Sequence, residues 1–346
     1  PEQSVKGKYV QLNTERYGGM IYSTWFDRPL SIAGRVLVKT DKGVETRLVN
    51  IDRDLLVIPN LAIHMDRTVN EGMKYNPQVN LLPLFGDAAA KDSFDRLVAQ
   101  ACETEEENIL SSDLFLYNRC KPVVWGSHNE YMSCAKLDDL ECAFSSLKAF
   151  INAGNPESVS VCAVFDNEEV GSSTKQGANS TFLYDVLHRI NMNLGRSEEE
   201  YYTSVASSFM LSADNAHALH PNHPAVSDPT NQVFLNDGIV IKYNANQKYT
   251  TDAVSAALFQ SMCADNQVPV QSFVNRSDLA GGSTLGNISN SHVSLNTVDI
   301  GLPQLAMHSS YETAGVVDLG YMISSMEAFY NTAVVANCDG SYEIHK

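Results

Sequence analysis

The chain has 346 residues, of which 44% are hydrophobic, so it can bury the core of one large domain or of two smaller ones. Lys and Arg number 24 and Asp and Glu 41, and the net charge of −17 argues against nucleic acid or an anionic membrane as the main partner. No apolar run approaches the roughly 18 residues of a membrane span, and seven single cysteines without C-x-x-C indicate reduced thiols in the cytoplasm.

The N-terminal part of the chain is predicted to be rich in β-strands. Residues 8–85 alternate apolar and polar positions, with a turn signal at "TDKG". Residues 91–111 favour an acidic helix, whose "ETEEEN" run is typical of a solvated face or loop. The pattern changes near residue 117.

Beyond that point, strands and helices alternate. The predicted elements are a helix at 136–154, a buried strand at 159–165, a helix at 177–192, strands at 207–212 and 238–243, a helix at 251–265, a strand at "NTVDIGL" and a helix at 312–332. This alternation predicts an α/β sandwich with a mainly parallel central sheet. Ligands in such sheets bind at the carboxyl ends of strands.

Acidic residues gather at these predicted strand ends. The strand at 159–165 runs into Asp166, Glu168 and Glu169. Other elements are expected to bring four more groups to the same edge, namely Asp138, Asp139, Asp214 and His308. Unpaired carboxylates so close together would repel one another or take up protons, and a divalent metal removes that problem. Oxygen and nitrogen ligands suit zinc, manganese or cobalt.

The adjacent pair Glu168–Glu169 fits a division of labour. Neighbouring side chains of an extended backbone point to opposite sides, so one can bind metal while the other faces a water molecule. The alternative is that both glutamates merely favour a helix N-terminus and remain in solvent.

Seven segments share long, ordered motifs with a known family. They are "TWFDRPLSIAGRVLVK", "IPNLAIHMDRTVNEG", "KLDDL", "FDNEEVGSSTKQGA", "SADNAHALHPN", "GIVIKYNANQKYTTDAVS" and "QLAMHSS". From about residue 8 to about 332 the chain resembles the aspartyl aminopeptidases, dinuclear zinc exopeptidases of the aminopeptidase I type. The resemblance implies a three-layer, zinc-exopeptidase-like α/β sandwich with a mainly parallel sheet.

The resemblance also implies a role for each residue of the site. Asp138 would bridge two metal ions, with Glu169 and His308 as ligands of one or the other and Asp214 as a terminal ligand. Glu168 would be the general base that takes a proton from the attacking water. Two divalent ions per subunit are implied, with zinc first and manganese or cobalt as alternatives.

Substrate-binding residues follow from the same resemblance. His217 is expected near the scissile carbonyl and Lys242 in substrate binding, where its cation could pair with an acidic side chain. His64 would reach the active site of a neighbouring subunit, and Gly282 and Ser283 would line the pocket.

The implied organisation is a β-rich dimerisation domain at 8–118 inserted into a catalytic domain that continues at 119–346. Dimers would build a tetrahedral dodecamer. The expected substrates are peptides with an N-terminal Asp or Glu, and a broader neutral or leucyl aminopeptidase is the alternative.

One departure from the family pattern concerns a further histidine ligand in an H-x-D motif. Residues 1–20 contain no such motif. We expect either that the motif and the N-terminal part of the catalytic domain lie upstream of Pro1, or that one metal site is incomplete. In the second case the chain would be an assembly scaffold with impaired catalysis, and a module that binds acidic termini without hydrolysis is a third alternative.

Overall fold

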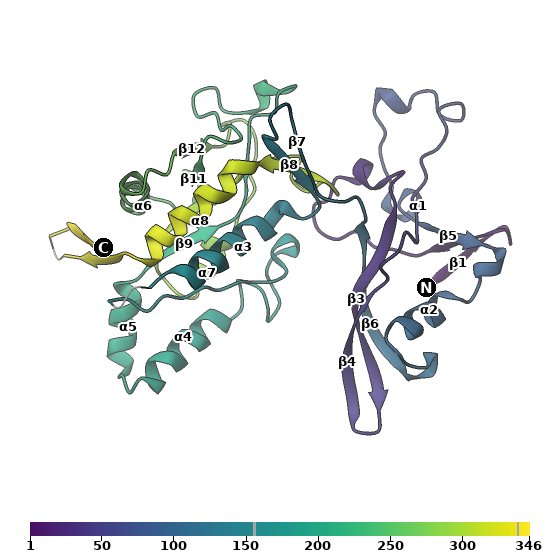
Figure 1. Ribbon diagram of the computed structural model, residues 1–346, viewed down its shortest axis with the longest axis horizontal. Coiled ribbons are helices and arrows are strands. Elements are labelled where there is room, and N and C mark those ends of the chain that lie inside the picture. The colour runs from purple at the N-terminus through teal and green to yellow at the C-terminus, as the bar shows by residue number, and fades with distance from the viewer. Residues whose placement is uncertain (155–156, 338) are drawn as a thin grey trace. The chain divides into compact units, whose positions relative to one another are not determined.

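The computed structural model describes residues 1–154, 157–337 and 339–346. They form two compact units (Figure 1). The first unit comprises residues 1–122 and 308–311, and the second comprises 123–307 and 312–346. Within the described ranges, no helix combines the length and apolar character that a bilayer crossing requires.

The first unit is built on a three-stranded antiparallel sheet in the order β4-β3-β6. Its strands are β3 (Leu30–Thr40), β4 (Gly43–Asn50) and β6 (Ile109–Asn118). Alternate residues of β3 point to one face, where Leu30, Val36 and Val38 are at most 1% exposed. The other face carries the Arg35–Asp113 ion pair. This alternation confirms the β-strands predicted for this part of the chain.

A second antiparallel sheet, in the order β1-β2-β5, completes the strands of this unit. The remaining elements are β1 (Glu2–Val5), β2 (Tyr9–Leu12), β5 (Leu84–Asp87), α1 (Pro77–Asn80) and α2 (Phe94–Ala101). The helix predicted over 91–111 is shorter, because α2 ends at Ala101, Glu103 adopts a left-handed backbone conformation, and β6 begins at Ile109.

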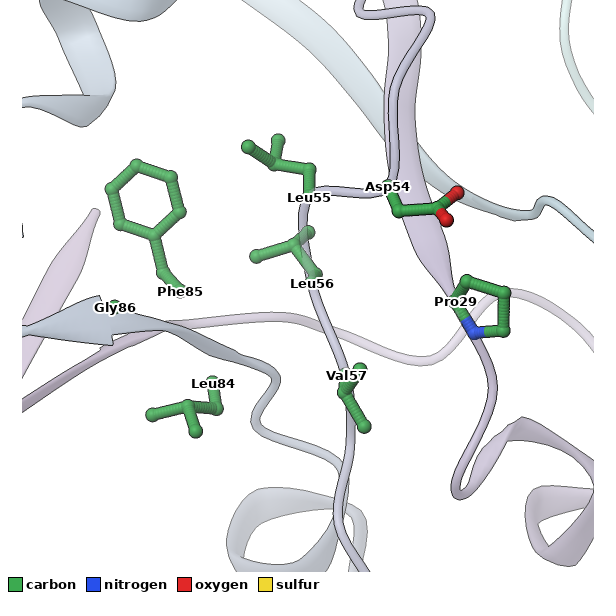
Figure 2. Close-up of a pocket in the computed structure, with 8 residues that line it drawn as sticks. All are labelled: Pro29, Asp54, Leu55, Leu56, Val57, Leu84, Phe85 and Gly86. Carbon is green, nitrogen blue, oxygen red and sulfur yellow. The ribbon is translucent and has the colours of Figure 1, made fainter.

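An open apolar hollow of about 290 Å³ lies in the first unit, between β5 and the segment 54–57 (Figure 2). Val57 and Leu84 form a single antiparallel bridge there. The lining residues are Pro29, Asp54, Leu55, Leu56, Val57, Leu84, Phe85 and Gly86. None of them is a predicted site residue.

A four-stranded sheet in the order β12-β11-β13-β9 forms the centre of the second unit. Its strands are β9 (Phe209–Ala213), β11 (Ile239–Tyr243), β12 (Val270–Val274) and β13 (Asn296–Gly301). One face is apolar and packs under α3 (Leu137–Asn152), α6 (Ala253–Asp265) and α8 (Val316–Tyr330) (Figure 1). The opposite face bears Ser212, Lys242 and Asp299, all buried, beside α7 (Leu285–Asn290).

The other elements of the second unit include a five-stranded sheet in the order β10-β14-β15-β8-β7 and a hairpin, β16–β17. The strands are β7 (Val123–Trp125), β8 (Tyr131–Cys134), β10 (Ala216–His217), β14 (Pro303–Leu305), β15 (Glu312–Gly315), β16 (Ala333–Ala336) and β17 (Tyr342–His345), and the helices are α4 (Phe182–Asn193) and α5 (Glu198–Ala206). Helix α5 was not predicted, although Ser197 and Glu200 form a capping box that signals its start.

The predicted mainly parallel central sheet is confirmed in part within the described chain. In the four-stranded sheet β11–β12 and β13–β9 are parallel but β11–β13 is antiparallel, and most pairings of the five-stranded sheet are antiparallel. The architecture is α/β with mixed sheets. Hydrophobic pattern locates a strand but does not set its direction, because both directions bury the same face.

The buried strand predicted over 159–165 is wrong. This segment has no strand partner among the described residues, and Val159 and Val164 are 72% and 60% exposed. A strand exists only where its backbone N–H and C=O groups pair with a neighbour, whatever its side chains favour.

Asp318 fastens the start of α8 to the turn before β11. Its carboxylate is buried and accepts hydrogen bonds from the backbone N–H groups of Asn236 (2.6 Å) and Gly238 (3.0 Å). Burial raises the pKa of the Asp318 carboxyl to about 6, despite these two bonds.

We predict that Asp318→Asn gains stability relative to the wild type as pH rises. The raised pKa means that the folded wild type binds the proton more tightly than the unfolded chain, so its stability falls as pH rises through about 6. Between about pH 5 and about pH 7 the difference in unfolding free energy should shift by about 1.4 kcal/mol in favour of the variant. Denaturant titrations at each pH measure it. The same shift in Asp95→Asn, on the exposed side of α2, would contradict this assignment.

Candidate metal centre

The start of α3 presents two carboxylates, Asp138 and Asp139, on non-helical backbone. Lys136 before them adopts a left-handed conformation, and the peptide bond between the two aspartates is cis. The backbone N–H of Asp138 donates to Oε2 of Glu312, a buried residue of β15, at 3.1 Å. The two acidic side chains therefore precede the regular helix rather than lie along its face.

Asp214 joins them from the sheet. It directly follows β9, and its backbone N–H donates to the carbonyl oxygen of Ile300 on β13 at 3.1 Å. Carboxylate oxygens of Asp138, Asp139 and Asp214 all lie within 4.8 Å of one another. The structure thus brings two of the predicted ligands together and adds Asp139 to them.

Asp138 also approaches a second acidic group from another direction. One of its oxygens lies within 4.8 Å of a carboxylate oxygen of Glu169. Glu168 and Glu169 stand in a 3₁₀ turn, Glu168–Val170, and not on extended backbone. Successive side chains of such a turn diverge by roughly 120°, so the two glutamates still point in different directions. The cause is the geometry of the 3₁₀ turn and not the extended backbone that the sequence predicted.

The loop that carries these glutamates folds back on itself. Backbone hydrogen bonds join Asp166 N–H to the Gln176 carbonyl at 2.9 Å and Ser172 N–H to the Asn167 carbonyl at 2.8 Å. A Cβ at Gly177 would collide with the Ser172 carbonyl, so only glycine lets the two sides of the loop approach so closely. The acidic turn is therefore held by its own loop.

The cluster is electrostatically unbalanced as it stands. Burial raises the pKa of the Asp139 carboxyl well above its usual range, and the neighbouring charges of Asp214 and Asp138 add to the effect. Oδ1 of Asp139 is buried without a hydrogen-bond partner among the described residues. A divalent cation would satisfy both conditions, because it would neutralise the carboxylates and could accept the buried Asp139 oxygen as a ligand. The residues present therefore fit a metal site.

Lys242 supplies one positive charge next to Asp214. The side chain is 1% exposed, and its Nζ donates to the backbone carbonyls of Asp214 (2.8 Å) and Asn215 (3.3 Å). Nζ also lies 3.8 Å from Oδ2 of Asp214 and 5.2 Å from the centre of the Tyr249 ring. Burial lowers the pKa of Lys242, but Asp214 and Asp299 outweigh it, so the pKa is raised overall. The ammonium is thus charged, and its predicted contact with substrate stays a prediction.

The remaining predicted site residues lie on other elements. His308 belongs to the segment 308–311 of the first unit, where its Nδ1 lies 3.1 Å from the Gly19 carbonyl oxygen, so its ligand role stays a prediction. His217 is exposed at the end of β10, and its ring centre lies 6.1 Å from that of Phe273.

Three predicted residues stand on exposed loops. His64 lies in the loop before α1, in the first unit, and Gly282 and Ser283 lie in the loop before α7, in the second. The hydroxyl of Ser283 donates to Oδ1 of Asn287 at 3.1 Å.

Sequence reasoning missed two buried carboxylates that support the cluster. Glu312 holds the Asp138 backbone, as described above. Glu141, three residues after Asp138 on α3, is 6% exposed, and its Oε2 accepts from Nδ2 of Asn215 at 3.3 Å. Burial raises the pKa of the Glu141 carboxyl to about 8. An acidic residue within the apolar run "LECAF" was the available signal.

Comparison with known proteins agrees with a metal centre. Residues 1–330 match the family model described as aminopeptidase I zinc metalloprotease (M18). A probable M18 family aminopeptidase 2 of Clostridium acetobutylicum is 49% identical over 337 residues, covering 96% of this chain and 78% of that protein.

Solved structures give the same result. A chain in the cryo-EM structure of the Ape4 and Nbr1 complex is 37% identical with a TM-score of 0.90, covering 95% of this chain and 68% of that one. The S. cerevisiae mApe1 dodecamer is 26% identical with a TM-score of 0.78, covering 95% and 74%. The chain therefore belongs to peptidase family M18, the aminopeptidase I zinc metalloproteases, and is a metalloaminopeptidase, a hydrolase of the exopeptidase class.

Proposed function

We propose that this aminopeptidase uses a pair of divalent metal ions held on the two sides of Asp138. The observation that carries the proposal is that Asp138 is shared by two groups of acidic side chains, one with Asp214 and one with Glu169. A shared carboxylate is the arrangement that a two-metal site needs. Asp138 would bridge, Asp214 and Glu169 would be ligands, and His308 would complete the set. Zinc is the proposed metal, with manganese or cobalt as alternatives.

When bound, such ions polarise the scissile carbonyl and acidify water. The chain itself supplies the proton transfer. Glu168 lies beside the ligand Glu169 in the same turn, and its carboxylate takes a proton from the attacking water and passes it to the leaving amine. His217 is proposed to lie at the scissile carbonyl.

The proposed substrates are peptides with an N-terminal Asp or Glu. Lys242 is a buried cation next to Asp214, and its positive charge favours an acidic side chain in a site otherwise lined by carboxylates. Gly282 and Ser283 are proposed to line the pocket, and His64 to reach the site of a neighbouring subunit. A broader neutral or leucyl aminopeptidase is the second candidate. The Lys242 ammonium already donates to the Asp214 carbonyl, and if this structural role is its only one, it gives no preference for acidic substrates.

We also propose an oligomeric assembly in which residues 8–118 form a dimerisation domain and dimers build a tetrahedral dodecamer. The likeness to the S. cerevisiae mApe1 dodecamer supports this proposal. The catalytic domain, 119–346, is proposed to be a three-layer sandwich. The proposed location is the cytoplasm, supported by the free cysteines of the described chain, Cys102, Cys120, Cys134, Cys142, Cys162 and Cys263.

Exchanging Glu168 and Glu169 in turn separates the base from the ligand. Glu168→Gln should lower kcat by about 10²- to 10⁴-fold, because the amide cannot accept the proton, while two metal ions per chain remain bound. Glu169→Gln makes the same chemical change one residue on and should instead lower metal content. Hydrolysis of an aspartyl peptide and elemental analysis of the purified variants measure the two effects.

The reverse outcome, with metal lost in Glu168→Gln and retained in Glu169→Gln, would exchange the two assignments. A wild-type chain that binds no metal at all would favour the scaffold alternative.

The role of Lys242 in specificity is tested by Lys242→Met, which keeps the length of the side chain and removes its charge. If the ammonium pairs with an acidic substrate, the ratio of kcat/KM for aspartyl over leucyl substrates should fall about ten- to a hundredfold. A change of this size corresponds to the usual free-energy contribution of a hydrogen bond to a charged group. An unchanged ratio in an enzyme that is slower on both substrates would assign Lys242 to structure alone.

A further inference from the structure

A buried polar row crosses the face of the four-stranded sheet opposite α3, α6 and α8. Asp299 on β13 is paired in register with Ser212 on β9. On the other side, the antiparallel register pairs Ile241 with Ile300, which makes Lys242 and Asp299 cross-strand neighbours. Asp299 has no exposed surface. A fully buried carboxylate needs both a cation and hydrogen-bond donors, and Asp299 has both.

The carboxylate of Asp299 joins two loops. Oδ2 accepts hydrogen bonds from the backbone N–H of Thr250 (2.5 Å) and from its hydroxyl (2.6 Å). Oδ1 accepts from the hydroxyl of Thr284 at 2.8 Å. The backbone N–H of Asp299 donates to Oγ1 of Thr251 at 2.8 Å. One residue thus binds the loop 244–252 and the loop 275–284.

The two loops leave the same edge of the sheet. Loop 244–252 follows β11 and loop 275–284 follows β12, and these strands are parallel neighbours. The second loop leads into α7 at Leu285, and a Cβ on Gly286 would lie 2.6 Å from Oδ1 of Asp299. Only glycine therefore lets α7 sit this close to the carboxylate.

The same buried cation serves Asp299 and the metal centre. The charges of Asp214 and Asp299 both stabilise the ammonium of Lys242, which donates in turn to the Asp214 carbonyl. Both loops are therefore bound to the buried polar row, in which Lys242 donates to the Asp214 carbonyl. A shift of either loop would break a bond to a buried charge, which is far more unfavourable than breaking one at the surface.

We infer that Asp299 is a positioning residue for peptide hydrolysis, which fixes the loops 244–252 and 275–284 against the sheet at a set distance from Asp214. The inference rests on the proposed function, in which Gly282 and Ser283 of the second loop line the substrate pocket. Asp299 itself touches neither substrate nor metal. Its effect is on substrate binding, through the loop, and leaves the bond-breaking groups intact.

The test compares Asp299→Asn with Asp318→Asn, a matched change in a second buried carboxylate that binds no part of either loop. Hydrogen exchange followed by mass spectrometry reports on the loops, and steady-state kinetics and metal content report on the site. Asp299→Asn should exchange at least about tenfold faster in both loops and raise KM about tenfold, with kcat within about threefold and metal content unchanged. Asp318→Asn should do none of this.

Two single-loop variants refine the test and keep it decisive if Asp299→Asn does not fold. Thr284→Val removes the bond to the second loop only, and should speed exchange in 275–284 and raise KM. Thr250→Val removes the hydroxyl bond to the first loop only, and should speed exchange in 244–252.

Unchanged exchange in both loops, or faster exchange spread evenly over the chain, would overturn the positioning role. So would a fall in kcat at constant KM. A wild-type enzyme without peptidase activity would refute the proposed function instead, and the exchange measurements would still show whether Asp299 holds the loops.

Discussion

The second unit depends on the contact between the Lys242 ammonium and the backbone of Asp214 and Asn215. A cation with 1% exposure is tolerated only because negative groups surround it, and here Asp214 and Asp299 do so from two strands. Removal of the ammonium would leave the carboxylates of Asp214 and Asp299 without the cation that they share. The metal centre and the loops that flank it therefore share one source of electrostatic balance.

Local departures from regular structure place the reactive groups. Asp138 and Asp139 stand on a non-helical start of α3, and Glu168 and Glu169 stand on a short turn after the left-handed Asn167. Asp214 leaves the sheet where β9 ends. In each case the rigid element fixes the backbone, and the irregular residues next to it turn the carboxylates toward one another.

Sequence alone predicted the helices and strands that carry a strong pattern of apolar residues. α6, α8 and β11 carry continuous apolar residues, and the structure confirms them with small shifts at their ends, such as the four residues of β15 that precede α8. The acidic members Asp138, Asp214 and Glu169 were also predicted, because charge at a strand or helix end is visible in the sequence.

What the sequence could not predict depends on long-range pairing. The segment 159–165 has the composition of a strand, yet no partner strand lies beside it in the described chain. The antiparallel direction of β13, and the burial of Asp139, Glu141 and Asp299, follow from which elements become neighbours. Amino-acid composition does not determine which elements become neighbours. Asp139 was therefore expected at the site without its burial, and the supporting positions of Glu141 and Asp299 were not predicted.

The shared position of Asp138 has a thermodynamic consequence. A proton or a cation bound on the Asp214 side changes the charge felt on the Glu169 side, and by linkage the reverse change is equal in size. In the proposed two-metal arrangement the two sides of Asp138 would therefore fill cooperatively or compete, and they would not behave as independent sites.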